Sequence, residues 1–85
     1  MPVVSMFYGI IVKMHWSDHN PPHVHAEYQG YKASILLDGA LSEGGLPKKQ
    51  LKLVQAWLEI HHDELEANWK LAQSKEQLFK IEPLR

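Results

Sequence analysis

Apolar and polar residues alternate near the start of the chain in the pattern of a β-strand. From Phe7 to Trp16 every even position is apolar, and the odd positions become polar towards the end of the segment. This period of two predicts one strand over residues 7–16 with one buried face. The next segment, Ser17 to Pro22, contains two prolines, which cannot donate hydrogen bonds to a sheet, and therefore predicts a loop.

A β-hairpin is predicted over residues 23–37. Two alternating segments, His23 to Tyr28 and Tyr31 to Leu37, flank Gln29-Gly30, which suits a two-residue turn. With this turn every cross-strand pair is chemically matched: Tyr28 with Tyr31, Glu27 with Lys32, Ala26 with Ala33, and His25 with Ser34. Because paired residues share a face of the sheet, the alanines fall on the apolar face and the histidines on the other.

The second half of the chain has helical periodicity. No glycine or proline occurs between Pro47 and Ser74, and apolar residues recur at heptad-like steps. We expect one long helix there, or two consecutive helices if the chain breaks near His61-His62-Asp63, where Asp63 could cap the second helix. Short strands are expected at residues 40–42 and 78–81.

These elements predict an α+β fold. Residues 1–85 form one domain, in which a small antiparallel sheet of three to four strands packs on one long helix or on two consecutive helices.

Composition narrows the classes of function. The absence of cysteine excludes disulfides, thiolate zinc sites and cysteine nucleophiles, and it fits a reducing compartment. No apolar run approaches the roughly 20 residues that span a bilayer, and the apolar N-terminal run lacks a basic start and a cleavage site. We therefore expect a cytoplasmic protein with no membrane partner. A formal net charge of −1 argues against tight, sequence-independent binding to nucleic acid.

The strand pattern gathers polar side chains on the sheet face opposite the predicted helix. Together with the adjoining loop, which also carries Asp18, this face presents the candidate catalytic residues Lys13, His15, His19, His23, His25 and Glu27. A solvent-exposed sheet face without any function would carry the same kinds of polar residues, so a functional site on this face is a hypothesis.

Two chemistries suit these residues, and both stay open. His23 and His25 project to the same side of a strand and could bind a divalent metal such as zinc, with His19, His15 or Glu27 as a third ligand and an open position for water. We take His19 as the first choice of third ligand. Alternatively, the histidines could act without a metal as a general acid and base, with a lysine stabilising a phosphoryl anion.

Several segments together resemble a bacterial family called domain of unknown function 4160. They are Phe7-Tyr8-Gly9-Ile10-Ile11, the block His19-Asn20-Pro21-Pro22-His23-Val24-His25-Ala26 with its flanking Asp18 and Glu27-Tyr28, Gly45-Leu46-Pro47, Glu64-Leu65, Asn68-Trp69, and Lys80-Ile81-Glu82-Pro83-Leu84. The resemblance implies a small toxin–antitoxin component whose gene stands beside that of another family, domain of unknown function 2442. It assigns no reaction to the histidines.

The resulting expectation is the toxin component of a bacterial toxin–antitoxin-type pair. Such a protein would act through the histidine-rich sheet face on RNA or nucleotide phosphodiesters, and its partner would be a cognate small antitoxin-like protein encoded nearby. A metal-binding domain, with metal-dependent hydrolysis as its activity, and a non-enzymatic protein-interaction module are the alternatives. Whether the chain forms a homo-oligomer stays open.

Overall fold

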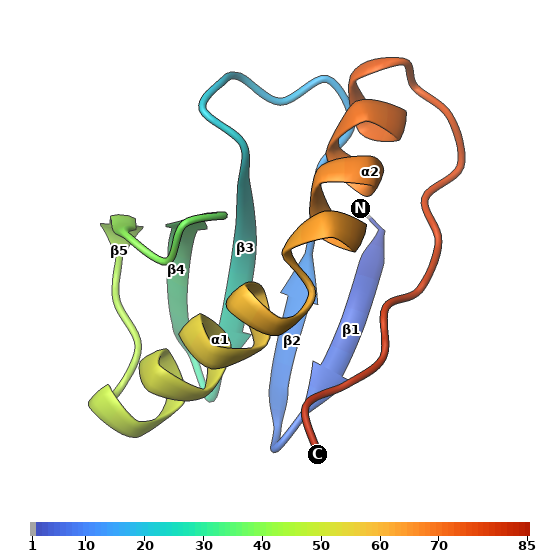
Figure 1. The fold of residues 1–85 in the computed structure, drawn as a ribbon. Helices are drawn as coiled ribbons and strands as arrows, with labels where there is room; N and C mark the ends of the chain where they lie inside the picture. Colours follow the sequence, from blue (N-terminus) through green and yellow to red (C-terminus); the bar gives the residue numbers. More distant parts are fainter. Residues whose placement is uncertain (1) are drawn as a thin grey trace.

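Two helices cover one face of a five-stranded antiparallel sheet in the computed structural model, which describes residues 2–85 (Figure 1). The strands are neighbours in the sheet in their order along the chain: β1 (Val3–Phe7), β2 (Ile10–Lys13), β3 (His23–Tyr28), β4 (Tyr31–Leu36) and β5 (Leu41–Gly44). The helices α1 (Lys48–Ile60) and α2 (His62–Gln73) follow. The predicted α+β class is confirmed, but the sheet has five strands and not three to four.

The additional strand arises because the predicted single strand over residues 7–16 is wrong. The chain reverses at Tyr8-Gly9, where both residues have positive φ angles, 48° and 78°, as a type I′ turn requires. The reversal places Phe7 of β1 opposite Ile10 of β2. Tyr8 is 61% exposed at the tip of this hairpin and does not belong to the buried face. Alternation alone hid the turn, because Tyr8 fitted the apolar parity of the strand that follows.

The hairpin of β3 and β4 matches its prediction at all four pairs: Tyr28 with Tyr31, Glu27 with Lys32, Ala26 with Ala33, and His25 with Ser34. Both alanines are buried. On the other side of β3, Lys13 of β2 lies opposite His25. The predicted strand at residues 40–42 is found as β5, shifted to Leu41–Gly44.

The helical region divides into two, as one of the two predictions allowed. The break is at His61, whose φ and ψ angles are −107° and 25°. Asp63 does not cap α2, since the cap position is His61, and lies instead in the first turn of the helix. There its charge is favourable for the helix dipole. The buried residues of the two helices complete the core with the apolar face of the sheet: Val54, Trp57, Leu58, Leu65, Asn68, Trp69 and Ala72.

After α2 the chain runs back along the outer edge of β1 as an irregular segment (Figure 1), so the strand predicted at residues 78–81 is wrong. One backbone hydrogen bond joins it to the sheet, from the Ile81 N–H to the Val4 carbonyl at 2.8 Å. Asn68 holds it from the helix side, because its Nδ2 donates to the Phe79 carbonyl at 2.8 Å and its Oδ1 accepts from the Phe79 N–H at 3.1 Å.

Candidate functional site

The loop between β2 and β3 is fixed to the end of α2. The Ser17 N–H donates to the Ala72 carbonyl at 3.1 Å, and the Gln73 Nε2 donates to the Asp18 carbonyl at 2.9 Å. The first of these bonds gives a partner to a carbonyl in the last turn of the helix. They also hold the side chain of Asp18 over the beginning of β3.

The carboxylate of Asp18 is the centre of the histidine cluster. Its Oδ2 lies 2.9 Å from His23 Nε2 and 3.0 Å from His25 Nε2, and its Oδ1 accepts the backbone N–H of His19 at 2.9 Å. Burial alone would raise the pKa of Asp18, but the hydrogen bonds from His25 and His19 and the charge of His23 outweigh it and lower the pKa to about 2. The carboxylate is therefore ionised at neutral pH.

Both ring nitrogens of His23 face hydrogen-bond acceptors. Nδ1 lies 2.7 Å from the Pro21 carbonyl, which can only accept, so this nitrogen carries a proton. Nε2 faces the Asp18 Oδ2 at 2.9 Å. A neutral imidazole would present only a lone pair there. The contact is therefore satisfied either by a second ring proton on His23 or by a metal ion that both atoms bind from one side.

His23 is also more buried than the strand parity indicated. The sequence placed it on the open face of the sheet, but the side chain is only 4% exposed and its ring centroid lies 5.3 Å from that of Trp69 in α2. The reason is its position at the first residue of β3, where the loop and α2 close over the strand. Alternation along a strand does not report what covers its end.

His25 can adopt either tautomer. Its Nε2 lies 3.0 Å from the Asp18 Oδ2, and its Nδ1 lies 3.3 Å from the Ser34 Oγ. Because a serine hydroxyl can donate or accept, Nδ1 is satisfied with or without a proton. With the proton on Nδ1, the lone pair on the His25 Nε2 would face the Asp18 Oδ2, as the lone pair on the Nε2 of a neutral His23 would. The side chain is 29% exposed, so this part of the cluster reaches the surface.

The four predicted histidines of the loop and sheet face are contiguous. Ring centroids are 3.9 Å apart for His15 and His25, 5.0 Å for His23 and His25, and 5.1 Å for His19 and His23. Burial and the neighbouring charge of His25 lower the pKa of His15. His19 is at the rim, since its side chain is 78% exposed and its Nε2 is 3.8 Å from the Asp18 Oδ1.

Two of these histidines and Asp18 lie close enough together to hold a metal ion. Asp18, His23 and His25 each offer one ligand atom, and these atoms lie within 4.8 Å of one another. His19 was expected as the third ligand, whereas in the structure the carboxylate of Asp18 lies beside His23 and His25. The available signal was a carboxylate in the short loop that leads into a His-x-His strand.

Lys13 and Glu27, the other two predicted catalytic residues, form an ion pair with each other. The Lys13 Nζ lies 2.9 Å from the Glu27 Oε2, and this hydrogen bond is the main cause of the lowered pKa of Glu27. The pair lies on the same sheet face as His25, beside the hydrogen bonds of Asp18 but not part of them.

An open hollow of about 360 Å³ lies next to His25 on this sheet face. Its polar lining consists of His15, His25, Glu27, Lys32, Ser34 and Glu43. A molecule bound here would have direct access to the exposed edge of the cluster.

Comparison with known proteins gives a family and no activity. No curated protein and no solved structure matches the chain. Within residues 2–85 no helix has both the length and the apolar character needed to cross a membrane. A family model described as "Domain of unknown function (DUF4160)" matches residues 9–70, which include the histidine cluster and most of both helices. The chain therefore belongs to this family.

Proposed function

We propose that this protein binds a divalent metal ion, zinc in the first instance, through Asp18, His23 and His25, and uses it for hydrolysis. The observation that carries the proposal is the pair of imidazole Nε2 atoms that face a single carboxylate oxygen, at 2.9 Å and 3.0 Å. A cation shared by these three atoms would satisfy all of them.

The groups behind the ligands support this proposal. Metal-binding histidines commonly donate their second ring N–H to a carbonyl or another acceptor, which fixes the tautomer and the ring orientation. The His23 Nδ1 has such a partner in the Pro21 carbonyl, at 2.7 Å, and the His25 Nδ1 has the Ser34 hydroxyl, at 3.3 Å. Two histidines and one carboxylate are also a recurrent ligand set for catalytic zinc.

The exposed side of the cluster suits hydrolysis. Three protein ligands leave a coordination position for water, whose pKa a bound zinc ion lowers to about 7. The hollow beside His25 would hold the substrate, and Lys32 in its wall could stabilise negative charge on a phosphodiester. RNA or a nucleotide is the substrate class that we propose.

Metal analysis of protein purified without a histidine tag tests the metal site. We expect about one equivalent of zinc per chain after incubation and desalting, and its loss in Asp18→Asn and His25→Ala. His62→Ala is the matched control, because this histidine lies on α2 outside the cluster and should leave the metal content unchanged. Substoichiometric metal in the unmodified protein, or equal loss in all three variants, would contradict the proposal.

A second candidate is metal-free cleavage of RNA by the histidines, as a toxin-type activity. The specific observation is that Asp18 binds the His25 Nε2, which would leave a Nδ1 lone pair beside the Ser34 hydroxyl, where a substrate hydroxyl could replace it. His25 would then act as the general base, and a cognate antitoxin-like protein would be the partner.

Expression from an inducible promoter tests the toxin role, and RNA cleavage in the presence of a chelator separates the two candidates. The unmodified protein should arrest growth and His25→Ala should not. RNA cleavage by the purified protein should persist in a chelator if the chemistry is metal-free, and stop if it is not. Equal growth with both proteins would count against a toxin role, and it would leave the metal analysis to stand by itself.

A further inference from the structure

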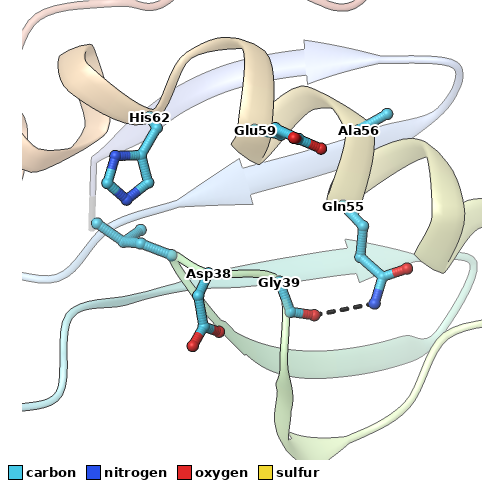
Figure 2. Close-up of a pocket in the computed structure, with 7 residues that line it drawn as sticks. Asp38, Gly39, Gln55, Ala56, Glu59 and His62 are labelled. Atoms are coloured by element: carbon cyan, nitrogen blue, oxygen red, sulfur yellow. Dashed lines mark hydrogen bonds between the residues drawn. The ribbon is translucent and has the colours of Figure 1, made fainter.

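A groove lies outside the histidine site, between the helices and the β4–β5 connection. It consists of two adjoining hollows of about 500 Å³ and about 200 Å³, which share Leu37, Asp38 and His62. Figure 2 shows the larger hollow, with the Asp38-Gly39 turn on one side and the helix residues on the other. The Gln55 Nε2 donates to the Gly39 carbonyl at 2.9 Å and fixes the turn against α1.

The rim of this groove is acidic. Asp38, Glu59 and Glu66 contribute carboxylates, and none of the lining residues is a lysine or an arginine. The one lining histidine, His62, already has a carboxylate beside it, because its Nε2 lies 3.4 Å from the Glu66 Oε1. A ligand that enters the groove therefore meets uncompensated negative charge.

The remainder of the lining is mostly apolar. The apolar lining residues are Pro21, Pro22, Leu36, Leu37 and Ala56. Ile60, one helical turn after Ala56, extends this apolar character onto the outer surface, since it is 65% exposed. Long basic side chains suit such a surface, because their aliphatic stems can cover apolar residues while their charged ends reach the carboxylates.

We propose that this groove, which we call the acidic groove, docks a segment of a protein partner that carries lysine or arginine next to apolar residues. The carboxylates select against anionic ligands, nucleic acid included, and in favour of a basic segment. The lining includes none of Asp18, His23 and His25 and none of the polar residues of the hollow beside His25. The two sites adjoin at Pro21, whose carbonyl contacts His23. A partner could therefore occupy the groove while His25 and the hollow beside it stay open, so this proposal is independent of the function proposed above.

Titration with a synthetic peptide tests the groove. The probe is a short fluorescein-labelled peptide of leucine, arginine and glycine, and the comparison peptide has glutamate in place of each arginine. Fluorescence polarisation gives the Kd, and ¹⁵N spectra of the protein locate the bound peptide. We expect saturable binding of the basic peptide only, with shifts at the amides of Leu37, Gly39 and Ala56 and none at Ser34.

Charge-neutralising variants complete the test. The double variant Asp38→Asn, Glu59→Gln should weaken binding about tenfold, which corresponds to about 1.4 kcal/mol. The matched control is Glu76→Gln, Glu82→Gln, which removes two exposed carboxylates that line neither hollow of the groove and should change the Kd less than about twofold, as expected for a general charge effect. Absence of binding, equal weakening in both double variants, or shifts centred on the histidine face would each overturn the proposal.

Sedimentation of the protein alone is the last experiment. A dimer that the first double variant dissociates would assign the groove to a second copy of the chain, and would also overturn it.

Discussion

Gly44, at the end of β5, occupies a position where a side chain does not fit. Its φ angle is +68°, and a Cβ built there would overlap the carbonyl oxygen of Lys32. That oxygen accepts the Gly45 N–H at 3.0 Å and so closes the end of the sheet. The next residue, Gly45, has open space around the corresponding position and no positive φ angle. Two adjacent glycines therefore have different structural requirements.

We expect Gly44→Ala to lower the free energy of unfolding by about 1–3 kcal/mol, because a strained backbone conformation and a steric overlap both oppose it. Gly45→Ala should change that free energy by about 0.5 kcal/mol or less. Urea unfolding followed by tryptophan fluorescence measures both. Equal destabilisation in the two variants would show that the overlap with Lys32 is not the cause.

Ser34 provides the residue-scale test of how His25 is oriented. If its hydroxyl, 3.3 Å from the His25 Nδ1, positions a metal-binding imidazole, then Ser34→Ala should weaken zinc binding about tenfold, at the low end of the effect of groups behind a ligand. Ser42→Ala on the exposed strand β5 is the control. Competition with a chromophoric chelator gives the affinities. An unchanged affinity for Ser34→Ala would indicate that Asp18 alone orients His25.

At the scale of elements, the C-terminal segment, residues 77–85, covers the outer edge of the sheet at β1. The C-terminal segment lies along β1 and is attached to both helices, through Asn68 of α2 and through Trp57 of α1, whose Nε1 donates to the Glu82 carbonyl at 2.8 Å. Ile81 in this segment is 3% exposed. A sheet edge covered in this way cannot pair with another chain along its covered part.

Asn68→Ala should lower the free energy of unfolding by about 1–3 kcal/mol, because the variant removes two hydrogen bonds from a fully buried side chain and leaves the Phe79 backbone groups without partners. Glu66→Ala, an exposed position on the same helix, should change it by about 0.5 kcal/mol or less. The comparison uses the same urea titration. If Asn68→Ala were as stable as Glu66→Ala, the clamp would contribute nothing to holding the segment.

Periodicity predicted the elements whose partners are local in sequence. The register of β3 and β4 follows from alternation and a two-residue turn, and it was confirmed at every pair. The turn at Tyr8-Gly9 was missed, because its backbone angles and not its polarity distinguish it from a strand. The strand predicted at residues 78–81 was wrong, since the segment is attached mainly through the side chains of Trp57 and Asn68, which are distant in sequence.

At the scale of the whole molecule, the site joins three separate parts of the fold. Strand parity brought His25 and its neighbours to one face, but the role of Asp18 depends on the bonds that hold its loop to Ala72 and Gln73 of α2. Those bonds form only when the helix has packed on the sheet, and no local pattern in the sequence encodes them. For the same reason the burial of His23 by Trp69 could not be read from alternation.

This arrangement makes thermal stability a sensitive test of the proposed metal site. A zinc ion bound by Asp18, His23 and His25 would join the loop to β3 in the folded state only, and a ligand at 100 times its Kd adds about 2.7 kcal/mol to the free energy of unfolding. For a domain of this size that corresponds to a rise in Tm of roughly 10–20 °C. We expect this rise with zinc and its reversal by a chelator.

Asp18→Asn should show a shift of only a few degrees at the same free zinc concentration, since it keeps the side-chain shape but removes the charged ligand. His62→Ala, outside the cluster, should respond as the unmodified protein does. A Tm that zinc leaves unchanged in the unmodified protein would exclude the ion from this site, and the proton alternative for the contact between His23 and Asp18 would then hold.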